Sequence, residues 1–192
     1  MMKQAKKSKR HELLRELLGN NPFHTDAQLA MTLNVSVQTI RLDRVRLAIP
    51  ELRERIKTMA TSAQSKLRSI DSNDVVGDLI DIELGINGIS VMQVTPDMVI
   101  DRTGIARGYY MFAQANTLAL AIVDAPAALT GVANIKYLRP IYEGERLIAK
   151  AQVIRQRGNK FFIWVKIRNE KYEVFRAKFI VVSLSSGEDS VK

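Results

Sequence analysis

Cysteine is absent from the 192-residue sequence, and histidine occurs only at His11 and His24. The absence of cysteine excludes disulfides, thiolate catalysis and cysteine-ligated zinc. No apolar run approaches the roughly 18–20 residues that a membrane-spanning helix needs. The basic N-terminus MMKQAKKSKR is followed by no apolar segment typical of a secretory signal, so we expect a cytoplasmic protein without a membrane span. With 46% hydrophobic residues the chain can bury a core, which excludes disorder.

Acidic residues are scarce in the first third of the chain. Residues 1–70 hold 14 Lys/Arg against 6 Asp/Glu, a net charge of +8, whereas residues 71–192 hold 15 against 14. Nearly all of the formal net charge of +9 therefore lies in the first third. This asymmetry is typical of a nucleic-acid-binding module attached to a neutral domain, although a solvated basic face without a partner would carry the same charge.

The pattern of residues 1–50 predicts a helix-turn-helix domain. Leucines at helical spacing predict a first helix over 9–18. Thr25 followed by Gln28 is the pattern of a capping box, which starts a second helix. Asn34 tolerates left-handed backbone geometry and predicts a short turn before the next helix. A short turn between two helices is typical of the DNA-binding form of this motif.

The third predicted helix, SVQTIRLDRVRL, has two distinct sides. We expect Val37, Ile40 and Val45 to face inward, and Asp43 to pair with a nearby arginine. The outward groups are suited to reading base edges and phosphates in a major groove: Ser36, Gln38, Thr39, Arg41 and Arg44. The segment 34–43 resembles the recognition region of DeoR-type repressors, which share the pattern V-S-x-x-T-I-R-x-D. An ordinary three-helix bundle with a charged face is the alternative.

An amphipathic linker helix is predicted over 51–72. Its apolar residues, from Leu52 to Ile70, keep one side apolar over about five turns. Three cations near its start are expected to reach phosphates or an adjacent minor groove: Arg53, Arg55 and Lys57. Two interpretations stay open: a fixed interdomain or dimer helix, and a switch element that docks on one domain or the other depending on ligand.

The remaining pattern predicts a hot-dog domain over 73–187, followed by a tail over 188–192. The order is two strands, one buried helix over 104–122, and four further strands: 77–84, 89–94, 130–138, 146–156, 160–168 and 173–184. This is the order of the hot-dog fold, in which an antiparallel sheet wraps one long helix. The segment 137–151 resembles the strand-turn-strand of acyl-CoA thioesterases, which implies a dimer that binds CoA thioesters at the subunit junction. The whole chain is therefore predicted to be α+β.

The predicted hot-dog domain lacks the usual catalytic groups. Residues 71–192 contain no histidine, and the helix 105–123 contains no acidic residue. Hot-dog thioesterases and dehydratases usually place an acid or a histidine near that helix. We therefore expect no enzyme, with no catalytic residue, no metal and no cofactor. The competing interpretation is an active acyl-CoA thioesterase or dehydratase that uses Asp101 or Asp124 and carries a DNA-binding head.

One arginine lies in the otherwise apolar helical stretch. A fixed guanidinium at Arg107 is suited to binding a carboxylate through two parallel hydrogen bonds. Gly108 allows a close backbone approach, and the Asn116 amide can donate or accept alongside. The alternative is that Arg107 pairs with a structural carboxylate such as Asp101.

Residues 106–116, ARGYYMFAQAN, carry the most specific resemblance. With the helix-turn-helix and the linker, they make residues from about 5 to 187 similar to the FapR family, repressors of fatty acid and phospholipid synthesis. The resemblance implies a homodimer that binds double-stranded operator DNA and is released by the effector malonyl-CoA. It also implies that Arg107 pairs with the malonyl carboxylate and that four other residues line the pocket: Gly108, Asn116, Leu129 and Ile100. A different acyl-CoA as effector stays open.

Overall fold

The first three helices form the predicted helix-turn-helix unit. The computed structural model describes residues 2–184, so the predicted tail over 188–192 and the domain end at 187 lie outside the described residues. Helices α1 (Met2–Asn20), α2 (Asp26–Leu33) and α3 (Val37–Arg46) surround a small core of Leu14, Leu18, Leu29, Ala30 and Ile40. Helix α1 is longer than predicted, because the polar residues before the leucines continue its regular backbone.

The predicted capping box of α2 and the predicted turn at Asn34 are confirmed. Thr25 and Gln28 form both halves of the capping box at the start of α2. Asn34 has the left-handed backbone angle φ of 51° and ends α2. Ser36 caps α3, because its hydroxyl accepts a hydrogen bond from the Thr39 amide. These local bonds satisfy backbone groups that helix ends otherwise leave unpaired, so they define the turn between the two helices.

The linker helix is shorter than predicted. Helix α4 extends over Leu52–Gln64, so the expectation of five continuous turns to Ile70 is wrong. The amides of Lys66 and Leu67 bond to carbonyl oxygens three residues earlier, which tightens the last turn and ends the helix. Leu67 and Ile70 still pack against an apolar core, although no helix carries them there.

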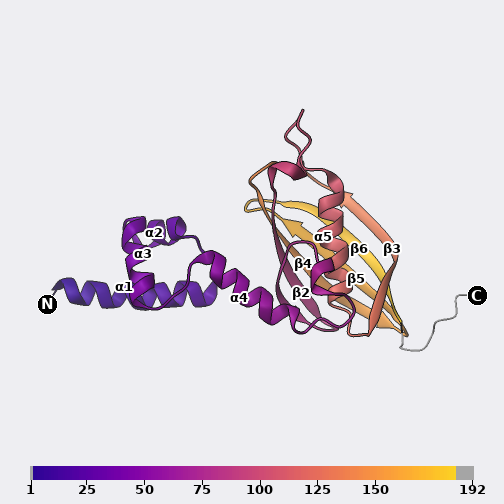
Figure 1. The fold of residues 1–192 in the computed structure, drawn as a ribbon, viewed down its shortest axis with the longest axis horizontal. Helices are drawn as coiled ribbons and strands as arrows, with labels where there is room; N and C mark the ends of the chain where they lie inside the picture. Colours follow the sequence, from indigo (N-terminus) through magenta and orange to yellow (C-terminus); the bar gives the residue numbers. More distant parts are fainter. Residues whose placement is uncertain (1, 185–192) are drawn as a thin grey trace, which may run out of the picture. The chain divides into compact units, whose positions relative to one another are not determined.

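The rest of the described chain forms the predicted hot-dog fold. Six antiparallel strands in the order β1-β2-β4-β5-β6-β3 form one sheet that curls around helix α5 (Figure 1). The strands are β1 (Asp78–Glu83), β2 (Asn87–Gln93), β3 (Ala127–Tyr137), β4 (Arg146–Arg157), β5 (Lys160–Arg168) and β6 (Glu173–Leu184). Short 3-10 helices lie at Ser72–Asp74 and Pro96–Met98.

Helix α5 (Gly108–Ala121) is the centre of the core. Its buried side chains, including Leu118 and Ala115, are fully covered by the inner face of the sheet. Gly88 of β2 permits this close approach, because a Cβ atom there would come within 2.7 Å of the Ile122 side chain. The predicted start at Gly104 is wrong: the preceding residues form two isolated β-bridges instead, and the helix begins at Gly108.

The chain divides into two compact units, one up to Thr58 and one from Met59, and helix α4 contributes to both. Among residues 2–184, no helix combines the length and the apolar character needed to cross a membrane. The same described residues contain no cluster of His, Asp and Glu that could hold a metal ion.

Candidate functional site

Helix α3 presents one exposed side that lies opposite its buried side. Ile40, Asp43 and Arg44 are buried, and a 100° turn per residue places five others away from the buried side of the helix. Those five are exposed: Gln38, Arg41, Leu42, Val45 and Arg46. Gln38 and Arg41 point outward as predicted. Val45 was expected to face inward, which is wrong, because its side chain is 76% exposed. Leu42 and Val45 therefore add apolar groups of the kind that contact thymine methyls.

The hydroxyls of Ser36 and Thr39 are used within the helix cap. Ser36 Oγ accepts from the Thr39 amide at 3.1 Å and lies 2.9 Å from Thr39 Oγ1. Ser36 is exposed and Thr39 is half-buried. The two hydroxyls therefore fix the first turn of α3. In this motif the N-terminal residues of the recognition helix contact base edges.

Arg44 does not point outward, and that expectation is wrong. Its side chain is buried and makes two parallel hydrogen bonds to Asp26 of α2, Nε to Oδ1 at 2.7 Å and Nη2 to Oδ2 at 2.9 Å. Its Nη1 also donates to the Ile49 carbonyl oxygen at 3.3 Å. The cause is position: Arg44 follows Ile40 by one helical turn and lies on the buried side. Arg44 therefore joins α2 to α3.

Arg55 is likewise a structural residue, contrary to the prediction that it reaches phosphates. Its guanidinium donates to three backbone carbonyl oxygens, those of Pro22, His24 and Pro50, at 3.0, 2.8 and 2.6 Å. Burial and, next, the charge of Arg44 lower the pKa of Arg55. Arg53 and Lys57, the other two predicted cations of α4, are exposed.

Asp43 has the role that its sequence position predicts. It is 1% exposed, and Arg10 and His11 of α1 contact its two carboxylate oxygens at 2.6 and 2.9 Å. Burial raises the pKa of Asp43, but the hydrogen bonds and charges of Arg10 and His11 outweigh it and hold that pKa below its usual value. The contacts of Asp43 with Arg10 and His11 therefore join α3 to α1.

In the hot-dog unit, Arg107 lies at the start of α5. It is the N-cap residue, half-buried, and its Nη1 donates to the backbone carbonyl of Asp97 at 2.8 Å. In the part of the chain that the structure describes, Arg107 forms no ion pair, so the alternative of a pairing with Asp101 is wrong. Its guanidinium is thus held at one nitrogen by a neutral oxygen.

A groove of about 370 Å³ lies beside this helix start. Its walls include Gly108 and Met111 of α5 and Tyr137 of β3. The Tyr137 hydroxyl donates to the Gly108 carbonyl oxygen at 2.9 Å, and a Cβ at Gly108 would come within 3.1 Å of the Tyr137 ring. Burial raises the pKa of Tyr137. The sequence predicts a close approach to the backbone at Gly108, and in the structure the group that approaches it is the Tyr137 side chain.

Of the predicted ligand residues, only Gly108 lines this groove. The Asn116 amide oxygen accepts a hydrogen bond from Thr130 at 2.6 Å. Asn116 is eight residues beyond Gly108, a separation of about 12 Å along the helix axis. Leu129 and Ile100 are 59% and 43% exposed. Asn116 is thus separated from Gly108 along the helix, whereas Ile100 lies beside Ile105, because its amide donates to the Ile105 carbonyl oxygen at 2.9 Å.

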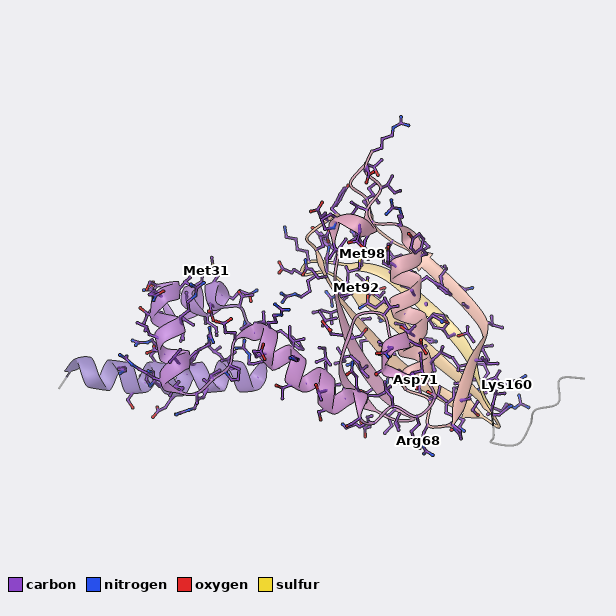
Figure 2. All side chains as sticks on the ribbon, viewed as in Figure 1. Met31, Arg68, Asp71, Met92, Met98 and Lys160 are labelled. Atoms are coloured by element: carbon purple, nitrogen blue, oxygen red, sulfur yellow. The ribbon has the colours of Figure 1, made fainter. Side chains whose placement is uncertain are left out.

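The carboxylate that flanks the other end of α5 is already engaged. Asp124 accepts a hydrogen bond from Arg68 at 2.6 Å, and Arg68 lies at the lower edge of the hot-dog unit in Figure 2. Asp101 is exposed.

The comparisons with known proteins agree with this architecture. The thioesterase superfamily matches residues 105–175. An uncharacterised protein from Pyrococcus horikoshii, of known structure, is 28% identical and superimposes with a TM-score of 0.58 over 62% of this chain and 92% of its own. Transcription factor FapR of Caldanaerobacter subterraneus subsp. tengcongensis is 55% identical over 100% of this chain and 95% of its own length. Transcription factor FapR of Bacillus cereus is 46% identical over 88% of this chain and 86% of its own.

A helix-turn-helix unit on a hot-dog domain defines a transcription regulator built on a thioesterase-like fold. The whole-length relatives are transcription factors and not enzymes, so this chain is not an enzyme. It belongs to the family of FapR transcription factors.

Proposed function

We propose that this protein represses genes of lipid synthesis, binds operator DNA as a homodimer, and leaves it when the hot-dog domain binds malonyl-CoA. Membership of the FapR family supports regulation of transcription. A transcription factor acts where the chromosome lies, so the proposal also places the protein in the cytoplasm.

The observation that carries the choice of ligand is Arg107. Its guanidinium stands at the start of α5 and donates to a neutral carbonyl oxygen. A carboxylate can accept two parallel hydrogen bonds from a guanidinium. The positive end of the helix dipole also favours the negative charge of a carboxylate. Malonyl-CoA carries a distal carboxylate, whereas acetyl-CoA has none. The adjoining groove of about 370 Å³ is in the size range of small-molecule sites.

The edge of the sheet supports the homodimer. Strand β3 lies at one edge of the sheet, and every residue from 131 to 137 of this strand is exposed. Ile135 and Tyr137 lie on the face that carries α5, yet they remain 36% and 49% exposed in a single chain. An edge strand with exposed apolar side chains is a template for pairing with another chain. A second copy that pairs there would cover both residues.

The helix-turn-helix unit supports the DNA partner. Its exposed α3 side carries an amide, two guanidinium groups and two apolar side chains, a set that can contact base edges and phosphates. Residues 1–70 also carry a net charge of +8, which favours phosphates. A near-complete release by ligand requires that malonyl-CoA favour the released state by about 5.5 kcal/mol.

Isothermal titration calorimetry with malonyl-CoA and acetyl-CoA tests the ligand. We expect malonyl-CoA to bind at least tenfold more tightly, and Arg107→Ala to remove most of that difference. Arg107→Lys keeps the charge but not the two-bond geometry, so it should recover only part of it. Arg102→Ala, an exposed arginine of the neighbouring loop, is the control. Equal affinity for both thioesters would contradict the choice of malonyl-CoA.

Release from DNA is measured with the same variants. The duplex is one that the protein itself selects from a random pool. We expect malonyl-CoA to dissociate the wild-type complex and the Arg102→Ala complex but not the Arg107→Ala complex. If Arg107→Ala releases DNA at the same concentration as the wild type, the carboxylate-recognition role is wrong.

A further inference from the structure

The hot-dog unit is nearly neutral as a whole, but its charges are segregated. Strands β3, β4, β5 and β6 hold ten Lys/Arg and a single acid, Glu173. The remaining acids of residues 71–192 therefore lie in loops, in short helices, on β1 or in the tail. A near-zero net charge thus hides a strongly basic part of the sheet.

Four of these cations form one row across the sheet. The register pairs Lys150 of β4 with Lys166 of β5, Lys166 with Arg176 of β6, and Arg176 with Lys136 of β3. All four are exposed, and the neighbours of Lys150, Lys166 and Arg176 on each strand are buried. Helix α5 lies against one face of the sheet (Figure 1). Since side chains alternate along a strand, the exposed row lies on the opposite face. We call these four residues the cation row.

The next register position extends the same surface. Trp164 of β5 pairs with Lys178 of β6, whose Nζ lies 4.8 Å from the centre of the Trp164 ring. A groove of about 380 Å³ is lined by Trp164 and Lys178 together with three members of the cation row, Lys136, Lys166 and Arg176. Within the described residues, Glu173 is the only acid that pairs with the row, through Arg176 at 2.7 Å.

The fold itself does not explain this arrangement. Like charges directly opposite each other on neighbouring strands destabilise a sheet. Lysine often protects an edge strand from pairing with other chains, but β5 and β6 are interior strands in the order β1-β2-β4-β5-β6-β3. A polyanion that binds the row would offset the repulsion. The helix-turn-helix unit of this chain is excluded as that partner, because residues 1–70 carry a net charge of +8.

We infer that the cation row binds the phosphodiester backbone of DNA, as a second contact in addition to that of the recognition helix. This inference rests on the proposed function, which supplies the DNA. Four adjacent strands span about 14 Å, which is the axial length of about four base pairs. Lysine and arginine side chains in one row can contact successive phosphates, and such contacts read no bases. The contact adds affinity and salt dependence without sequence specificity.

The slope of log Kobs against log salt concentration tests the inference, because it reports the number of phosphates neutralised. The probe is a mixed-sequence duplex of about 40 base pairs, roughly four helical turns. The variant is Lys150→Gln with Lys166→Gln, and we expect its slope to be shallower than that of the wild type by about 1.8. The matched control is Arg102→Gln with Lys171→Gln, which removes two exposed cations from the loops of the same unit. Its slope should equal that of the wild type.

Three outcomes would overturn the inference. If the cation-row variant has the wild-type slope, the row contacts no DNA. If the control pair lowers the slope equally, only net charge matters. If the row variant loses binding to vesicles of anionic phospholipid while its DNA slope is unchanged, the partner is a membrane surface. A wild-type protein that binds no duplex would instead refute the proposed function itself. Thermal unfolding of each variant verifies that the exposed substitutions leave the fold intact.

Discussion

Arg41 and Arg44 have the same side chain and lie three residues apart on α3, yet the structure gives them different environments. The side chain of Arg41 is 61% exposed, whereas that of Arg44 is 4% exposed and is bonded twice to Asp26. Residue type alone assigns both to DNA. The distinction comes from Ile40, which marks the buried side of the helix and places Arg44 next to the core.

Arg44→Ala should therefore destabilise the helix-turn-helix unit. The substitution leaves Asp26 without its two-bond partner and should cost about 3 kcal/mol of unfolding free energy. Arg41→Ala removes only a largely exposed ion pair to Asp26 at 3.6 Å, so it should change the melting temperature little and weaken DNA binding instead. Circular dichroism melts and binding titrations measure the two effects. If Arg44→Ala melts like the wild type, the Asp26 pair contributes no stability.

Asp43 makes the same unit sensitive to acid. Its pKa is depressed in the folded state, so its contribution to stability is complete above the unfolded value of about 3.9 and is lost as pH falls through the folded value. We expect the helix-turn-helix transition to lose stability steeply below about pH 4. Asp43→Asn should be less stable at neutral pH and should flatten that acid dependence. Melts at a series of pH values would contradict this if both proteins lost stability in parallel.

At the scale of elements, the sequence predicts the sheet better than the helices. The predicted ranges 160–168 and 173–184 match β5 and β6, because alternating polar and apolar residues define both faces of an interior strand. The end of α4 and the start of α5 were missed. The start of α5 depends on a long-range contact, the bridge between Ile105 and Tyr142. The chain that follows α4 is held by another, the hydrogen bond from Ser69 to the Leu120 carbonyl.

The candidate site was predictable only where a local signal exists. The start of α3 follows from Asn34 and Ser36, which are local turn and cap residues. The structural role of the half-buried Arg55 has no such signal, since its three carbonyl partners are fixed only after the chain has folded. Tyr137 was missed for the same reason, although Gly108 at the helix start marked a close approach.

The exposed edge strand β3 is the proposed dimer interface, so a substitution there should change the oligomeric state. Ile135→Lys places a charge among the exposed apolar residues of this edge and should convert the proposed dimer to a monomer. Ile86→Lys is the matched control, since Ile86 is 49% exposed in the turn between β1 and β2. Sedimentation velocity distinguishes the two variants. A dimeric Ile135→Lys protein would exclude this edge as the interface.

At the scale of the whole molecule, the chain has two units with separate cores. A ligand that binds one folded unit stabilises that unit by mass action. Malonyl-CoA at about one hundred times its Kd should raise the unfolding free energy of the hot-dog unit by about 2.7 kcal/mol. Differential scanning calorimetry should show that transition move while the helix-turn-helix transition stays. A shift of equal size in Arg107→Ala would contradict the assigned site.

The position of Trp164 gives the molecule a built-in optical reporter. It is the only tryptophan in the sequence, 43% exposed, and it lies beside the cation row with the Lys178 ammonium over its ring. The fluorescence of an indole depends on nearby charge and solvent, so phosphates that bind the row would change the emission. The helix-turn-helix unit contains no tryptophan and is silent. Emission at a single wavelength can therefore distinguish DNA held by the sheet from DNA held by the recognition helix alone, without any attached label.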